Sequence, residues 1–229
     1  MSAYDGIRPE GFLLLAQNRF EDSKEFYEAH KEEIKRLVIT PLGQIAEALA
    51  GDFSRLDPQM LLIPGRIVSR VRRDTRFTKE KHIYRDNVWI TFSRKGEGPM
   101  VWPCMWFEIL PAESVWTAGV CVYDNQPAYI RFLRARMAGE PEEFLRAAQR
   151  ALDAGASLQT DAYKKDTTGE APPPLRPYLN AKGWWLKYIS RELAPLAEET
   201  FPETLRGIYA AYAPMYRYLL AAAEEYLAD

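Results

Sequence analysis

The spacing of apolar residues changes twice along the chain, and this change limits the folds that the chain can form. In residues 22–49 apolar side chains recur at the spacing of one face of an α-helix. Residues 88–123 contain the two-residue alternation of β-strands, as at Val88, Ile90 and Phe92. Helical spacing then returns toward the end of the chain. Because strands close in sequence usually pair antiparallel, this order predicts an α+β fold with N-terminal helices, a central, mainly antiparallel sheet and C-terminal helices.

Proline and capping residues refine the boundaries of these elements. We expect Asp22 to cap the long N-terminal helix, with Glu25 reaching back toward it. Pro41 is expected to kink or split this helix, because proline has no backbone donor. The predicted helices are a short one at 12–18, the long one from 22, then 126–137, 140–154 and one that starts near Pro202. The predicted strands are 88–92, 101–110, 115–123 and 184–190, with 66–72 as a further candidate, turns at 95–99 and 111–114, and loops over 155–183.

The composition is that of a globular protein and predicts a single domain over 1–229. The chain has 229 residues, of which 47% are hydrophobic and 27% charged, and one core of this size is stable without disulfides or bound metals. Cys104 and Cys121 lie in apolar runs, which predicts buried thiols in a reducing compartment. No signal-peptide core opens the sequence, and no apolar run reaches the ~18 residues of a membrane span. We therefore expect a cytoplasmic protein without membrane contact.

Positive charge is concentrated in one segment of a chain whose net charge is -2. Residues 66–85 contain eight Lys or Arg against Asp74 and Glu80, a net charge of +6, which leaves -8 on the rest of the chain. Proteins that coat nucleic acid need many cations to neutralise phosphates, so the acidic remainder argues against nucleic acid as a partner.

The usual catalytic and cofactor motifs are absent from the sequence. Gly96 and Gly98 belong to a short turn without the Lys-Ser/Thr of a phosphate-binding loop, and no Gly-x-Ser-x-Gly elbow or dinucleotide fingerprint occurs. The two histidines, His30 and His82, have no metal-ligand spacing. The sequence therefore predicts no cofactor and no metal site, and it leaves open whether the protein is an enzyme.

The basic segment, over residues 70–85, carries the candidate ligand-binding residues. Arginine offers a planar, forked set of donors that matches the oxygens of phosphates and carboxylates. A pocket for a small anionic ligand is one interpretation, with Glu108 as an outlying candidate for a second carboxylate. The second is an internal ion-pair network between these cations, Asp74 and acids of the N-terminal helices, and the third is a docking surface for an acidic protein or a nucleic-acid backbone. The candidate residues are Arg73, Asp74, Arg76, Lys79, Lys81, Tyr84 and Arg85.

A family resemblance rests on the same segment. The run Arg-Asp-Thr-Arg-Phe-Thr-Lys-Glu-Lys at 73–81, followed by Tyr84-Arg85, resembles the hallmark of the uncharacterised DUF2461 family of bacterial and fungal proteins. The Gly-Phe pair at 11–12, the Phe-Tyr-Glu-Ala-His-Lys stretch at 26–31 and the Pro-Leu pair at 41–42 also resemble that family. The similarity covers about residues 11–220. It implies a shared fold and a shared basic motif, and no established activity comes with it.

Overall fold

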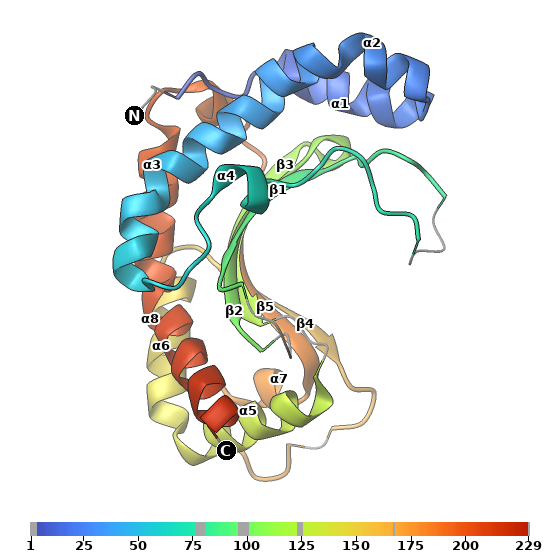
Figure 1. Cartoon of the computed structure of the whole chain (residues 1–229). Helices are drawn as coiled ribbons and strands as arrows, with labels where there is room; N and C mark the ends of the chain where they lie inside the picture. Colours follow the sequence, from blue (N-terminus) through green and yellow to red (C-terminus); the bar gives the residue numbers. More distant parts are fainter. Residues whose placement is uncertain (1–3, 77–80, 96–100, 123–125, 167, 229) are drawn as a thin grey trace. The chain divides into compact units, whose positions relative to one another are not determined.

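The computed structural model describes residues 4–76, 81–95, 101–122, 126–166 and 168–228. The chain has helices toward both of its ends and a five-stranded antiparallel sheet (Figure 1), which confirms the predicted α+β class. The residues group into two compact units. The first consists of 1–91, 106–117 and 190–206, and the second of 92–105, 118–189 and 207–229. The single domain over 1–229 stays a prediction.

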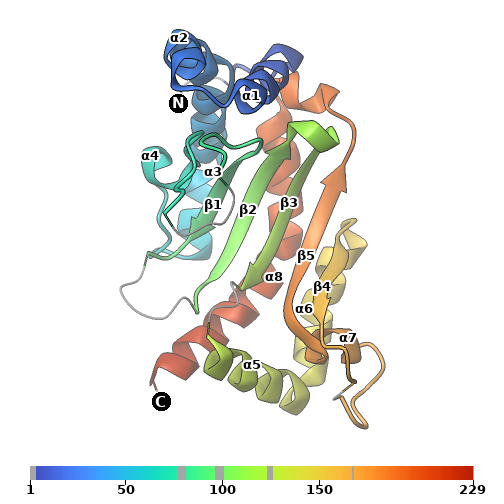
Figure 2. The ribbon, with the colours of Figure 1, turned by 90° about the vertical axis from the view of Figure 1, so that its right-hand side faces the viewer.

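The sheet has the strand order β1-β2-β3-β5-β4 (Figure 2). The strands are β1 (Val88–Ser93), β2 (Pro103–Leu110), β3 (Val115–Val122), β4 (Ser157–Ala162) and β5 (Ala181–Ser190). The helices are α1 (Pro9–Glu21), α2 (Lys24–Ile34), α3 (Thr40–Leu56), α4 (Pro64–Ile67), α5 (Pro127–Gly139), α6 (Pro141–Asp153), α7 (Arg176–Leu179) and α8 (Phe201–Ala228). Short turns of other helix types are η1 (Lys35–Ile39), η2 (Pro111–Glu113) and η3 (Ala194–Ala197). No helix of the described residues is both long and apolar enough to cross a membrane.

The turn between α1 and α2 corrects the predicted cap. Ser23, not Asp22, caps α2, because its side chain accepts a hydrogen bond from the Phe26 amide at 3.1 Å. Asp22 closes α1 instead, with a left-handed backbone at φ 42°. A helix N-cap needs an extended backbone, so Asp22 cannot cap α2 in this conformation. Its carboxylate is therefore available for contacts elsewhere.

The helix that precedes Pro41 widens into the π-helical turn η1, so the predicted interruption is present. The amide of Thr40 donates to the carbonyl of Lys35, five residues earlier, as in a π-helix. Because Pro41 has no N–H, the carbonyl of Leu37 receives no α-helical hydrogen bond from it. The turn gives α2, η1 and α3 one continuous path whose buried residues include Ile34 and Val38.

The strands of the middle region match the predicted alternation. In β1 the side chains of Val88, Ile90 and Phe92 are buried and those between them are half-buried. The second strand begins at Pro103 rather than at residue 101, because proline cannot donate within the ladder and suits a strand's first position. Residue 123 and most of the 95–99 turn lie outside the described residues.

Two regions differ from the prediction. The segment 155–183 was expected to form loops, but it contains β4, α7 and the start of β5. Strand β4 pairs antiparallel with β5, and its residues are almost all exposed, so it lacks the apolar alternation that identifies a strand. In the candidate strand 66–72, residues 66–67 belong to the helical turn α4, and only the residues after them are extended.

The two thiols are buried and close together, within the second unit. Cys104 and Cys121 are both free, and their sulfur atoms lie 3.5 Å apart. The hydrogen bond shared with Cys104 and burial both raise the pKa of the Cys121 thiol. The thiolate is the nucleophile, and burial hinders both its formation and the access of the reagent. We therefore expect both thiols to react with an aromatic disulfide reagent at least ~100-fold more slowly in the folded protein than in the unfolded chain. Reagent absorbance with and without urea measures both rates, and fast labelling of the native protein would contradict the burial.

Candidate functional site

The basic segment folds into a two-stranded antiparallel ribbon that leads into β1 (Figure 1). We call residues 68–73 together with 83–90 the basic ribbon. Its register is set by bridges from Val68 to Ile90 and from Arg72 to Tyr84. The Arg73 amide donates to the Ile83 carbonyl at 2.8 Å. Because paired residues share a face and neighbours alternate, Arg72 and Tyr84 lie on one face of the basic ribbon and Arg73 lies on the other.

Asp22 anchors the basic ribbon to the turn between α1 and α2. Its Oδ1 accepts hydrogen bonds from the Ile83 amide at 2.8 Å and the Tyr84 amide at 3.0 Å. Its Oδ2 lies 3.2 Å from Nδ1 of His82. Partial burial opposes ionisation of Asp22, but the hydrogen bonds from Tyr84, Ile83 and His82 outweigh it and lower its pKa. The Tyr84 ring is buried and stacks on Tyr27, with ring centroids 4.9 Å apart.

At the end of the basic ribbon the candidate residues pair with one another. Arg76 donates from Nε to Oδ1 of Asp74 at 2.9 Å and from Nη2 to Oδ2 at 2.6 Å. The side-chain hydrogen bonds from Arg76 lower the pKa of Asp74 to about 2. Both side chains are exposed, and so is Lys81. Lys79 lies outside the described residues. Arg76 and Asp74 thus form a solvent-exposed pair within one segment, and this pair includes no acid of the N-terminal helices.

The opposite face of the basic ribbon carries Arg73 and Arg85, both half-buried. The guanidinium of Arg85 lies over the Trp89 ring, 4.6 Å from its centroid. Burial and repulsion from Arg73 lower the pKa of Arg85. Glu108, the candidate second carboxylate, accepts a hydrogen bond at its Oε1 from Asn87 Nδ2 at 2.7 Å.

A cavity of about 460 Å³ lies beside the basic ribbon, and we call it the ribbon groove. One wall is a single face of α2, η1 and α3, where lining residues follow at intervals of four positions. These residues are Tyr27, Lys31, Lys35, Ile39 and Gly43. The other wall is formed by residues of the stretch 64–72, including Val68, Arg70 and Arg72.

The ribbon groove combines a basic rim with an apolar floor. Four cations, Lys31, Lys35, Arg70 and Arg72, line it against one carboxylate, Glu32. Lys31 pairs with Glu28 at 2.8 Å, outside the lining. Within the described part of the chain, no hydrogen bond or ion pair engages the charged groups of the other three cations. The buried side chains of Ile34 and Val71 form part of the floor. Such a lining suits an organic anion with an apolar portion.

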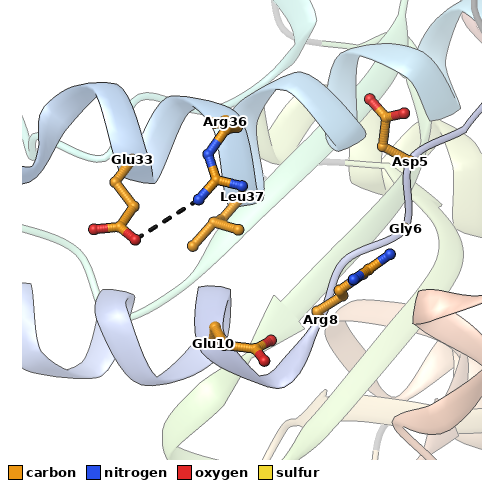
Figure 3. A pocket seen from close by; sticks show the side chains of 7 residues that line it. All are labelled: Asp5, Gly6, Arg8, Glu10, Glu33, Arg36 and Leu37. Carbon is orange, nitrogen blue, oxygen red and sulfur yellow. Dashed lines mark ion pairs between the residues drawn. The ribbon is translucent and has the colours of Figure 1, made fainter.

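A second cavity, of about 570 Å³, contains none of the candidate residues. It lies between the N-terminal strap (residues 4–8), the start of α1 and the end of α2 (Figure 3). Gln44 holds Asp5 in place, since its Nε2 donates to Oδ2 of Asp5 at 2.6 Å. Glu33 and Arg36 approach each other to 3.7 Å. With three acids and two arginines this cavity is less suited to an anion than the ribbon groove. The lining residues are Asp5, Gly6, Arg8, Glu10, Glu33, Arg36 and Leu37.

The structure does not bring the predicted candidate residues together in one cavity. The cations that meet in a cavity are Arg70 and Arg72, which precede the predicted set, together with Lys31 and Lys35 of the helix wall. Sequence reasoning missed the two lysines, although their spacing of four residues places them on one helical face with Tyr27. Among the described residues, no group of three or more His, Cys, Asp or Glu side chains could hold a metal ion.

A family model matches most of the chain. A family model described as "Conserved hypothetical protein (DUF2461)" matches residues 10–218. The chain therefore belongs to the DUF2461 family, and the matched range agrees with the predicted 11–220. No curated protein matches the chain.

Proposed function

We propose that the protein binds a small organic anion in the ribbon groove. The observation that carries this proposal is the convergence of four cations on one apolar-floored cavity. Arg70 and Arg72 would hold the anionic group with their forked donors, and Lys31 and Lys35 would add charge from the facing helix. The cavity volume of about 460 Å³ lies within the ~300–1,000 Å³ typical of small-molecule sites.

The proposal moves the expected binding site away from the end of the basic ribbon. Arg76 already has a carboxylate partner in Asp74, so an incoming anion would have to compete with that pair. Among the described residues no hydrogen bond or ion pair engages the guanidinium of Arg70 or Arg72, and Arg70 acts on Asp74 only through its charge, so an anion would find their donors available. The sequence motif and the groove share one basic ribbon, and the groove supplies the apolar surface that the motif lacks.

Thermal melts against a panel of anions test this function. The panel contains inorganic phosphate, nucleotides, phosphorylated sugars, dicarboxylates and monocarboxylates. A ligand present at 100 times its Kd adds about 2.7 kcal/mol of stability. For a chain of this size each kcal/mol raises Tm by about 2–4 °C, so the expected shift is about 5–10 °C.

A variant and a control test whether an anion that raises Tm binds in the ribbon groove. Arg72→Gln should reduce it, whereas Arg76→Gln should leave it unchanged because Arg76 does not line the groove. A panel in which no organic anion raises Tm, or in which both variants lose the shift equally, would refute binding in the ribbon groove.

A further inference from the structure

The ribbon groove has two chemically different ends, and two contacts define them. At one end Tyr27 stacks on Tyr84, and Tyr84 is the bridge partner of Arg72. At the other end α3 meets α4: a Cβ atom placed on Gly43 would lie 3.9 Å from Cβ of Pro64. The helix wall therefore runs from the Tyr27 end to the Gly43 end as the residue number rises. The facing wall runs the opposite way, from Pro64 to Arg72.

The charged lining residues are unevenly distributed along this direction. On the helix wall Lys31 and Lys35 come first, after Tyr27, and Ile39 and Gly43 follow. On the facing wall the order from the same end is Arg72, Arg70, Val68 and Pro64, because the chain runs antiparallel to that direction. All four cations thus lie toward the Tyr27 end. The lining residues toward the Gly43 end are apolar or glycine.

The apolar end is open enough to receive part of a ligand. Gly43 and Gly65 contribute no side chain to the lining, and a Cβ atom on Gly65 would meet nothing within 4 Å. Ile39, Pro64 and Val68 are half-buried, so each leaves apolar surface in contact with water. A ligand that covered this surface would gain affinity from the hydrophobic effect.

We infer that the ligand is a dissolved single-chain amphiphile, with a carboxylate or phosphate head and an unbranched apolar body. The head lies between Arg72, Arg70 and the two lysines, and the body extends toward Gly43 and Pro64. This inference rests on the proposed function, because it assigns the chemical class of the anion bound in the same groove. A sugar phosphate or an inorganic anion would contact only the basic half and would leave the apolar surface of the other half exposed to water.

A homologous series measures whether the apolar half contributes. Straight-chain monocarboxylates from acetate to decanoate, and the matching alkyl phosphates, are titrated into the full chain by calorimetry below their micelle concentrations. Each methylene buried in the groove should raise affinity by about threefold to fourfold, with a plateau once the apolar end is filled. A neutral alcohol of equal chain length should bind at least ~10-fold more weakly, because it cannot engage the cations.

Two glycine variants test where the chain lies. Gly65→Leu places a side chain in the open space at the apolar end and should abolish the gain from the longest chains, while affinity for butyrate stays unchanged. Gly43→Leu should act in the same direction, and it serves if Gly65→Leu alters the melt of the unliganded protein. Gly207→Leu is the matched control, since Gly207 is an exposed glycine of α8 with nothing within 4 Å of its Cβ position. It should leave the whole series unchanged.

Failure of this inference can be told apart from failure of the proposed function. Equal affinity for acetate and decanoate, both lost in Arg72→Gln, would overturn the amphiphile and keep an anion site in the groove. Binding only to anionic lipid vesicles or to an acidic peptide, with no monomeric amphiphile bound, would also overturn it. If no anion binds, the proposed function fails together with the inference.

Discussion

Replacing Arg70 and Arg72 together with glutamine is expected to weaken binding of an organic anion by about 100-fold to 1,000-fold. A hydrogen bond to a charged group contributes about 1.5–3 kcal/mol, so each arginine should account for roughly 10-fold to 100-fold. Both side chains are exposed, which places the expected loss for each near the lower end of that range. Isothermal titration at fixed ionic strength, with the single variants alongside, measures the losses and any coupling between the two arginines.

The chain offers a matched control for this loss. Arg76→Gln removes one positive charge from the same segment, as each single variant does, but the guanidinium of Arg76 pairs with Asp74 at the end of the basic ribbon. Affinity should therefore change by less than about threefold, which is the size expected for a screened surface charge. Should Arg76→Gln weaken binding as strongly as the double variant, the anion would bind at the end of the basic ribbon and not in the ribbon groove.

The second large effect concerns Asp22, whose removal is expected to detach the basic ribbon from the helices. Asp22→Ala should lower the free energy of unfolding by about 2–3 kcal/mol, because two backbone amides lose their acceptor and alanine disfavours a left-handed backbone. Asp22→Gly separates these causes, since glycine adopts the observed φ of 42° freely but offers no carboxylate. Asp22→Asn keeps one acceptor oxygen and should cost the least. Urea unfolding of the three variants gives the comparison.

Because the pKa of Asp22 is lowered in the fold, the stability of the protein should depend on pH in a known direction. Because the folded-state pKa lies below the unfolded value, the carboxylate's contribution is fully present above that unfolded value and is lost as pH falls through the folded pKa. The stability difference between the wild type and Asp22→Asn should thus be constant above about pH 5 and shrink in more acidic solution. A difference that stays the same at all pH values would show that hydrogen bonds to the ionised group do not stabilise the fold.

Local patterns in the sequence determined the class of the fold and most of its helices and strands. Alternation at Val88, Ile90 and Phe92 identified β1, and the missing donor of Pro41 indicated the interruption that forms η1. These predictions succeed because the spacing of apolar residues that marks a helix or a strand repeats within a few neighbouring positions. Strand β4 was missed for the same reason, since an exposed edge strand has no apolar period.

The basic segment was also evident from sequence, but its division into faces and partners was not. Charge density singled out residues 66–85, and only the tertiary structure placed Arg70 and Arg72 in the lining of a groove. The cap at Ser23 likewise freed Asp22 to bind Ile83 and Tyr84, about sixty positions away.

Only the tertiary structure decided which cations share a cavity. Lys31 and Lys35 lie on a helix that is separated from Arg70 and Arg72 by more than thirty residues of chain. A local pattern fixes the face on which a side chain lies, whereas a cavity arises where two distant segments pack incompletely against each other. The sequence therefore determined the fold class, the family and the supply of positive charge, and the packing of α2, η1 and α3 beside the basic ribbon decided which of these cations line one groove.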